Sequence, residues 1–171
     1  MSEVTRRAAI HRLTEERREL LALCDQLRPR AISRPGLGGG EWSPKDLIGH
    51  LESWEEHALA ALGAWSRDEP APIDRALRTD GLTAVNRSEV ERKAKRSVKA
   101  AFGAAAETHA ALLAAIETMP DRRWNAPATS RGHVSLGRRL GQILVGTRDP
   151  FAHDSAHLKD LRSFIDTHGT R

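Results

Sequence analysis

The stretch EWSPKDLIGHLESWEEHALAALGAW, residues 41–65, contains the clearest structural signal in the chain. Ser43 is placed to cap a helix, Pro44 suits the first helical position, and Asp46 completes a capping box three residues after the cap. Beyond them, apolar residues recur every three or four positions, which is the period of a helix with one buried face. The pattern predicts a helix that ends near Asp68. Its apolar positions are Leu47, Leu51, Trp54, Ala58, Leu62 and Trp65.

The same periodicity predicts three more long helices, separated by segments rich in glycine and proline. The expected ranges are 3–27, 82–119 and 149–168 or 169. Within the second of these, the polar run 93–96 predicts a break, with Ser97 as an internal cap. The segment 69–80 is expected to be a loop, and 135–144 a short helix. Four long helices without a strand pattern indicate an all-α fold, a four-helix bundle in a single domain spanning residues 1–171.

The composition is that of an ordinary soluble protein, because hydrophobic residues make up 39% and charged residues 29% of the chain. We find neither a signal peptide nor the roughly 20 consecutive apolar residues that a membrane span needs. The one cysteine, Cys24, lies on the apolar stripe of the first helix, so we expect it to be buried. These features predict a cytoplasmic protein without a membrane partner.

The formal net charge of +4 comes mostly from arginines that alternate with acidic residues. From Arg122 to Arg148, however, there are six arginines and no acidic residue. Arg131, Arg138 and Arg139 in this segment either form an anion-binding rim or belong to a plain charged loop, and the second interpretation is favoured. Nucleic acid is not expected as a partner, because the arginines lack clustered aromatic residues and a known reading motif.

Three histidines are spaced so that they can meet inside the bundle. His153 and His157 are four residues apart, so one helical turn places both imidazoles on one face, about 5–6 Å apart at Cβ. His50 shares its helix face with Leu47 and Trp54. Three nitrogen ligands with open positions are typical of catalytic metal centres. On spacing alone, three histidines hydrogen-bonded in a polar core explain the pattern equally well.

Two stretches resemble motifs of the DinB-like superfamily, which includes the metal-binding domains of mycothiol-dependent maleylpyruvate isomerases. Residues 41–55 look like its second-helix motif: a tryptophan, a capped helix start, and a metal-binding histidine followed by leucine. HDSAHLKDL, residues 153–161, is similar to its last-helix motif with two ligands four apart. Residues 82–120, including Asn86, are most similar to the ClbS/DfsB-type branch, which is associated with colibactin self-protection. The resemblance covers roughly residues 3–168.

This resemblance implies a four-helix bundle, a homodimer, and His50, His153 and His157 as ligands of one divalent metal ion. Nitrogen ligands suit Zn²⁺ or Ni²⁺, and also Fe²⁺ or Mn²⁺, without choosing among them. The implied activity is a metal-dependent transferase or hydrolase that detoxifies small electrophiles by thiol transfer, isomerisation or hydrolysis. One alternative is a self-resistance protein that sequesters a reactive small molecule. Another is a stress protein whose metal is only structural.

Other polar residues are candidates to support these ligands. The three are His57, Glu56 and Asp154. A half-exposed position is favoured for His57, and Glu55 and Glu56 are expected at the surface. His109 lies on an apolar stripe, so we expect a core histidine with a hydrogen-bond partner.

Overall fold

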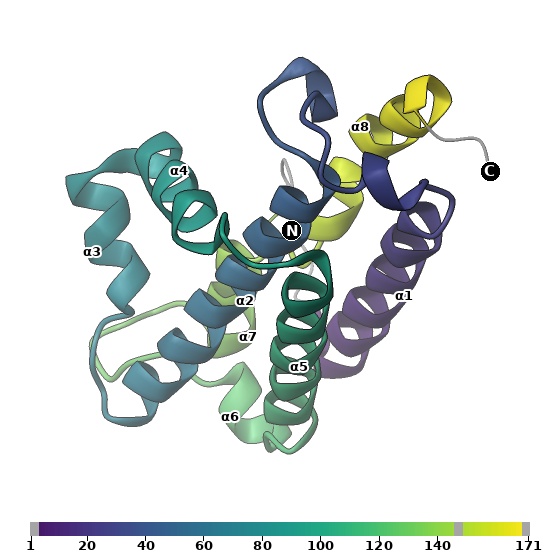
Figure 1. The fold of residues 1–171 in the computed structure, drawn as a ribbon. Coiled ribbons are helices and arrows are strands. Elements are labelled where there is room, and N and C mark those ends of the chain that lie inside the picture. The colour runs from purple at the N-terminus through teal and green to yellow at the C-terminus, as the bar shows by residue number, and fades with distance from the viewer. Residues whose placement is uncertain (1–3, 146–148, 169–171) are drawn as a thin grey trace.

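The computed structural model describes residues 4–145 and 149–168, and these residues form an all-α fold (Figure 1). α2 packs mainly against α5, and α1 packs mainly against α8. The predicted four-helix bundle is confirmed, and no β-strand occurs in the described ranges. None of the helices described is long and apolar enough to cross a bilayer. The four long helices are α1 (Arg6–Cys24), α2 (Pro44–Ser66), α5 (Val98–Glu117) and α8 (His153–His168).

Shorter helices occupy the connections. They are η1 (Pro29–Ala31), η2 (Leu37–Gly39), α3 (Pro72–Thr79), α4 (Gly81–Lys93), α6 (Asp121–Asn125) and α7 (Leu136–Ile143). The predicted short helix is α7, but the prediction of a loop over 69–80 is wrong, because α3 lies there. Pro72 occupies the first helical position, where a missing N–H costs nothing. Proline therefore begins this helix instead of preventing it.

The capping signals of the sequence form as predicted. The Ser43 hydroxyl accepts a hydrogen bond from the backbone N–H of Asp46, and the Asp46 carboxylate accepts one from the backbone N–H of Ser43 at 2.9 Å. The Ser97 hydroxyl accepts a hydrogen bond from the backbone N–H of Ala100 at the start of α5. The predicted break between α4 and α5 is therefore confirmed, and these caps set where α2 and α5 begin.

The last helix begins later than Asp149 and Pro150, where the sequence predicts its start. Its first residue is His153. Phe151, which precedes it, has a φ of +62°, a left-handed conformation that an α-helix cannot contain. The first helix ends at Cys24 instead of residue 27, because the backbone hydrogen bonds that follow it reach three residues back instead of four, as in a 3₁₀ turn. The predicted helix ends at residues 3 and 169 lie outside the described residues.

One buried polar layer divides the core into two apolar clusters. The first cluster includes Leu13, Trp54, Trp65, Leu112, Trp124, Leu140 and Phe151. The second includes Leu20, Cys24, Leu27, Leu47, Leu51, Ala105, Leu161 and Phe164, so the expected burial of Cys24 is confirmed. Each long helix contributes one residue to the layer between them: Arg17 from α1, Glu55 from α2, His109 from α5 and Asp154 from α8. On the buried face of each long helix, one polar residue therefore has a partner on another helix.

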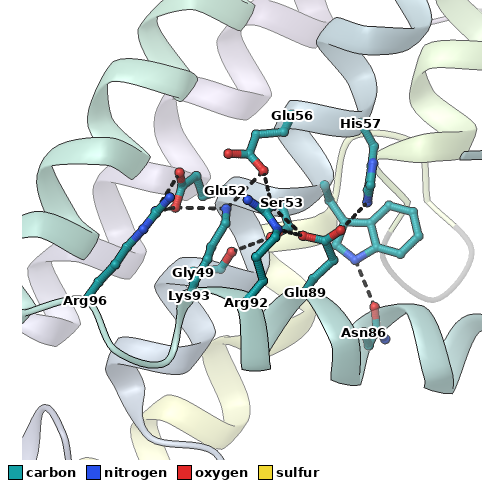
Figure 2. Close-up of polar contacts among 11 residues, drawn as sticks. Gly49, Glu52, Ser53, Glu56, His57, Asn86, Glu89, Arg92, Lys93 and Arg96 are labelled. Carbon is teal, nitrogen blue, oxygen red and sulfur yellow. Dashed lines mark hydrogen bonds and ion pairs between the residues drawn. The ribbon is translucent and has the colours of Figure 1, made fainter. Parts of the chain in front are cut away.

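α4 is attached to α2 by a row of charge pairs (Figure 2). Glu52, almost fully buried, lies between the Lys93 ammonium at 3.0 Å and the Arg96 guanidinium at 2.7 Å. One turn further along α2, Glu56 pairs with Arg92 at 2.6 Å and with Lys93 at 3.2 Å. Buried charges are stable only when paired in this way. The pairs hold the α3–α4 segment beside α2, where it forms one wall of the cavity described below.

Candidate metal centre

Three histidines from two helices converge at the α2–α8 boundary. We call His50 of α2 and His153 and His157 of α8 the histidine triad. One potential ligand atom from each lies within 4.8 Å of the others. The Nε2 atoms of His50 and His153 are 3.1 Å apart, and the His157 ring centroid lies 5.3 Å from those of both other rings. The structure therefore brings together the three residues that the sequence singles out.

The geometry of the triad suits a single metal ion. Two imidazole nitrogens bound to one ion at about 2.0–2.1 Å lie about 2.9–3.4 Å apart for bond angles between octahedral and tetrahedral. The 3.1 Å separation of the His50 and His153 Nε2 atoms falls within this range. The buried Nδ1 atom of His50 has no hydrogen-bond partner among the described residues. Packing orients this ring instead, because Trp42 and Trp54 lie 4.9 Å and 6.4 Å from it between centroids.

The surroundings keep all three imidazoles neutral. Burial, with smaller effects of the other two histidines and of Lys93, lowers the pKa of His50 to about 2. Burial, followed by the proximity of His157, lowers the pKa of His153 to about 4. Burial also lowers the pKa of His157. Neutral rings have a free lone pair at physiological pH, which is the form that metal binding requires.

The triad forms part of the wall of a cavity of about 590 Å³. Apolar side chains from α2, α3, α4 and α7, and from the chain just after α7, line much of it: Trp54, Ile73, Leu77, Leu82, Ile143 and Val145. Leu82 and Val145 are also the exposed large hydrophobic residues of the described chain. The polar lining consists of Asp74, Asn86, Arg139, Gln142 and Asp160. This volume and mixed lining are typical of sites for small organic molecules.

Trp54 links the cavity wall to α4. Its indole Nε1–H donates to the Asn86 side-chain oxygen at 3.1 Å (Figure 2). Elsewhere in the cavity lining, the Arg139 guanidinium donates to both Asp74 carboxylate oxygens, at 2.8 and 3.0 Å, and to the Gln142 side chain at 2.8 Å. These bonds connect α2 to α4 and α3 to α7, the helices that carry most of the residues lining the cavity.

The buried polar layer lies directly beside the triad, because Asp154 follows His153 in the chain. The Arg17 guanidinium donates to Asp154 at 2.5 Å and lies 3.2 Å from Glu55. Glu55 also lies 2.6 Å from the His109 Nδ1 atom, so the expected hydrogen-bonded core histidine is confirmed. The expectation that Glu55 lies at the surface is wrong, since only 3% of it is exposed. The polar Arg17 on the apolar stripe of α1 was the signal for a buried acidic partner.

The other predicted supporting residues lie on the α4 side of α2. Trp54 stands between His57 and the triad, with its ring centroid 5.6 Å from His57 and 6.4 Å from His50. The His57 Nε2 atom lies 3.6 Å from the Glu89 carboxylate, and Glu56 pairs with α4 (Figure 2). Of the three candidates, Asp154 is therefore the one that the structure places next to a triad residue.

The three arginines proposed as an anion-binding rim do not lie together. Arg139 lines the cavity. Arg138 and Arg131 are exposed, and Arg131 lies near Asp68, where its charge helps to lower the pKa of that carboxyl after the hydrogen bonds from Ser130. The cavity residues of α3 were not predicted, although the i, i+4 pair Ile73 and Leu77 after a proline was a usable signal.

Comparison with known proteins agrees with this architecture. A family profile of the DinB superfamily matches residues 8–147. No curated protein sequence matches the chain significantly. An uncharacterised protein from Escherichia coli UTI89 has a similar structure, with a TM-score of 0.78 and 12% identity over 96% of this chain and 94% of that one. The colibactin self-resistance protein ClbS, solved in complex with a dsDNA, has a TM-score of 0.72 and 12% identity over 97% and 96% of the two chains.

The expectation that excludes nucleic acid as a partner is wrong, because ClbS, which has a similar fold, was solved with dsDNA. The expectation depended on missing aromatic clusters and reading motifs. Contacts to the phosphate backbone require neither, since they depend on positive charge alone. At 12% identity the two structural relatives show the fold and nothing more. The profile match extends over most of the sequence, and its helical fold is the one observed: the chain belongs to the DinB superfamily.

Proposed function

We propose that this protein binds one divalent metal ion through His50, His153 and His157 and uses it to act on small electrophilic molecules. The observation that supports this most directly is that the triad lines a cavity of about 590 Å³. A metal ion buried on all sides is structural, whereas one that faces a cavity has room for a ligand. The DinB superfamily match supports metal binding, and the all-nitrogen donor set suits Zn²⁺ or Ni²⁺, with Fe²⁺ or Mn²⁺ as alternatives.

The chemistry would depend on what the ion and the chain each supply. A divalent ion held by the triad would supply Lewis acidity: it would bind a thiol as the thiolate or lower the pKa of a bound water toward 7. The chain contributes binding and orientation: Trp54 and Leu77 contact the apolar body of a substrate and exclude water. Asn86 and Arg139 offer polar contacts to its other groups. The products would be a thiol adduct, an isomer or a hydrolysed compound.

Turnover separates this proposal from its alternatives. The metal-loaded protein is incubated with a panel of electrophiles, such as epoxides and activated alkenes, with and without a low-molecular-weight thiol. Catalysis predicts many product molecules per protein, which His50→Ala abolishes and His168→Ala preserves. Consumption of one equivalent at most would identify a sequestering protein of the self-resistance type. Neither binding nor turnover of any member would overturn the proposal.

Contact with DNA is a second candidate, favoured by the ClbS complex with dsDNA and by the net charge of +4. The test is fluorescence anisotropy with a labelled duplex at low and moderate salt. Binding through phosphates predicts an affinity that falls steeply as salt rises. No detectable binding at low salt would exclude this candidate and leave the small-molecule site unaffected.

A further inference from the structure

Three residues of α1, Arg12, Glu16 and Arg17, bind the start of α8 and the segment that leads into it. Arg12 donates to the Asp149 carboxylate at 2.5 Å and to the Pro150 carbonyl at 3.2 Å. Four residues later, Glu16 accepts a hydrogen bond from the backbone N–H of Ser155 at 3.2 Å. The first N–H groups of a helix have no partner inside that helix, so Glu16 satisfies one of them from a neighbouring helix.

The remaining contacts tie these residues into one unit. The Arg12 Nε–H donates to Glu16 at 2.8 Å. Arg12, which binds the chain before α8, therefore also orients Glu16, which binds the first turn of α8. Arg17, the next residue along α1, binds the buried Asp154 carboxylate at 2.5 Å. Asp154 and Ser155 directly follow His153, and Ser155 is two residues before His157. The contacts of α1 therefore lie on the part of α8 that contains two members of the triad.

The backbone before His153 is held in an unfavourable conformation. Phe151 has a φ of +62°, which residues with side chains rarely adopt. Its side chain is 1% exposed and stacks on Trp124 at 5.9 Å between centroids. A Cβ atom on Gly141 would lie 2.9 Å from the Phe151 ring, so α7 packs closely against it. Such a conformation persists only when surrounding contacts impose it.

α8 has little direct contact with the helix that carries the third histidine. It packs extensively on α1 and only slightly on α2. Among the long helices, α1 therefore makes most of the contacts that align His153 and His157 with His50. We propose that Glu16 and Arg17 are positioning residues of the metal site, which fix the register and direction of α8 so that its histidines face His50. This inference rests on the proposed metal-binding function.

The experiment compares Glu16→Ala with Glu16→Gln and with Glu19→Ala. Glu19 lies on the same helix and also pairs with α8, through Arg162, but this pair is exposed and lies beyond the triad. Zn²⁺ affinity is measured by competition with a chelating dye, and exchange of the Ser155 amide hydrogen by NMR in the metal-free protein. We expect Glu16→Ala to weaken Zn²⁺ binding by roughly 10–100-fold and to accelerate Ser155 exchange. Glu16→Gln keeps an acceptor oxygen, so it should restore most of the Zn²⁺ affinity and most of the protection of the Ser155 amide. Glu19→Ala should change neither the affinity nor the exchange.

Each outcome has a defined meaning. Zn²⁺ affinity of Glu16→Ala within about threefold of the original would overturn the positioning role, as would equal losses in Glu16→Ala and Glu19→Ala. If Glu16→Ala does not fold, Asp154→Asn tests the other half of the proposal, because it weakens the contact of Arg17 with α8 while preserving side-chain size. An original protein that binds none of Zn²⁺, Ni²⁺, Fe²⁺ and Mn²⁺ would overturn the proposed function and this inference with it. If Glu16→Ala binds Zn²⁺ weakly while the original protein binds it well, both the proposed function and the positioning role are supported.

Discussion

The Nε2 atoms of His50 and His153 lie 3.1 Å apart, although 103 positions separate these residues in the chain. Two neutral imidazoles can share one proton at this distance, or both can direct lone pairs at one cation. The structure satisfies the geometry of either arrangement. What favours the cation is that His157 completes a set of three and that the set faces a cavity.

The depressed pKa values of the triad predict how the stability of the metal-free protein depends on pH. Unfolding returns each histidine to a pKa near 6.5, whereas folding holds His50 at about 2 and His153 at about 4. Below about pH 6.5 the unfolded chain therefore binds protons that the folded chain does not, and stability falls as the pH falls. Each such histidine contributes about 1.4 kcal/mol per pH unit until the folded pKa is reached.

Urea unfolding of the metal-free protein at several values between pH 8 and pH 4.5 measures this dependence. The variant His153→Ala/His157→Ala should show a shallower decline. Added Zn²⁺ should raise the melting temperature strongly at pH 8 and progressively less as the pH falls through about 6 to 5, because protons compete for the same nitrogens. An equal metal-induced shift at pH 8 and pH 5 would mean that carboxylates hold the ion.

Glu52→Gln should destabilise the fold by about 3 kcal/mol, because it removes the charge that faces two cations. Glu52 and Lys93 have side chains that are 2% and 4% exposed, so water cannot replace the lost partner (Figure 2). The matched control is Glu69→Gln, whose pair with Arg67 is mostly exposed and contributes at most about 1 kcal/mol. Chemical denaturation of both variants gives the comparison. Equal effects would show that burial does not determine the strength of the α2–α4 contact.

Gly137→Ala should destabilise the protein by about 1–3 kcal/mol or more. The added Cβ atom would lie 2.2 Å from the Trp124 ring, which is buried and donates a hydrogen bond to the Val4 carbonyl at 3.1 Å. Gly103→Ala is the control, since no atom lies within 4 Å of its Cβ position on α5 and helix propensity favours alanine by about 0.5–1 kcal/mol. Melting temperatures should therefore move in opposite directions. A stable Gly137→Ala variant would show that α6 and α7 are not tightly packed.

Local signals made part of this structure predictable. The capping box at Ser43 and Asp46 fixed the start of α2, and with it the face on which His50 lies. The i, i+4 spacing of His153 and His157 placed both rings on one side of α8. These features depend on neighbours within one helical turn, so the sequence alone contains them.

The remaining features depend on contacts between distant residues. Glu55 is buried because Arg17 and His109, on two other helices, satisfy its charge. α8 begins at His153 because the contacts of Phe151 with other helices impose its left-handed backbone. Arg17 on the apolar stripe of α1 signals a buried acidic partner, but no local pattern identifies that partner or the contacts of Phe151, which is why the surface position of Glu55 and the early start of α8 were predicted wrongly. The pairing of Asp154 with Arg17 became visible for the same reason only in the structure.

Metal binding by the protein purified without a histidine tag tests the central claim most directly. Metal content by mass spectrometry and Zn²⁺ affinity by competition titration are measured for the original chain, for His50→Ala, His153→Ala and His157→Ala, and for His168→Ala. His168 is the control, since it lies at the far end of α8 and stacks on Phe164. We predict about one ion per chain, a loss of roughly 100-fold or more in affinity for each triad variant, and no change for His168→Ala. Full metal content in a variant that lacks all three triad histidines, or no bound ion in the original chain, would contradict the account.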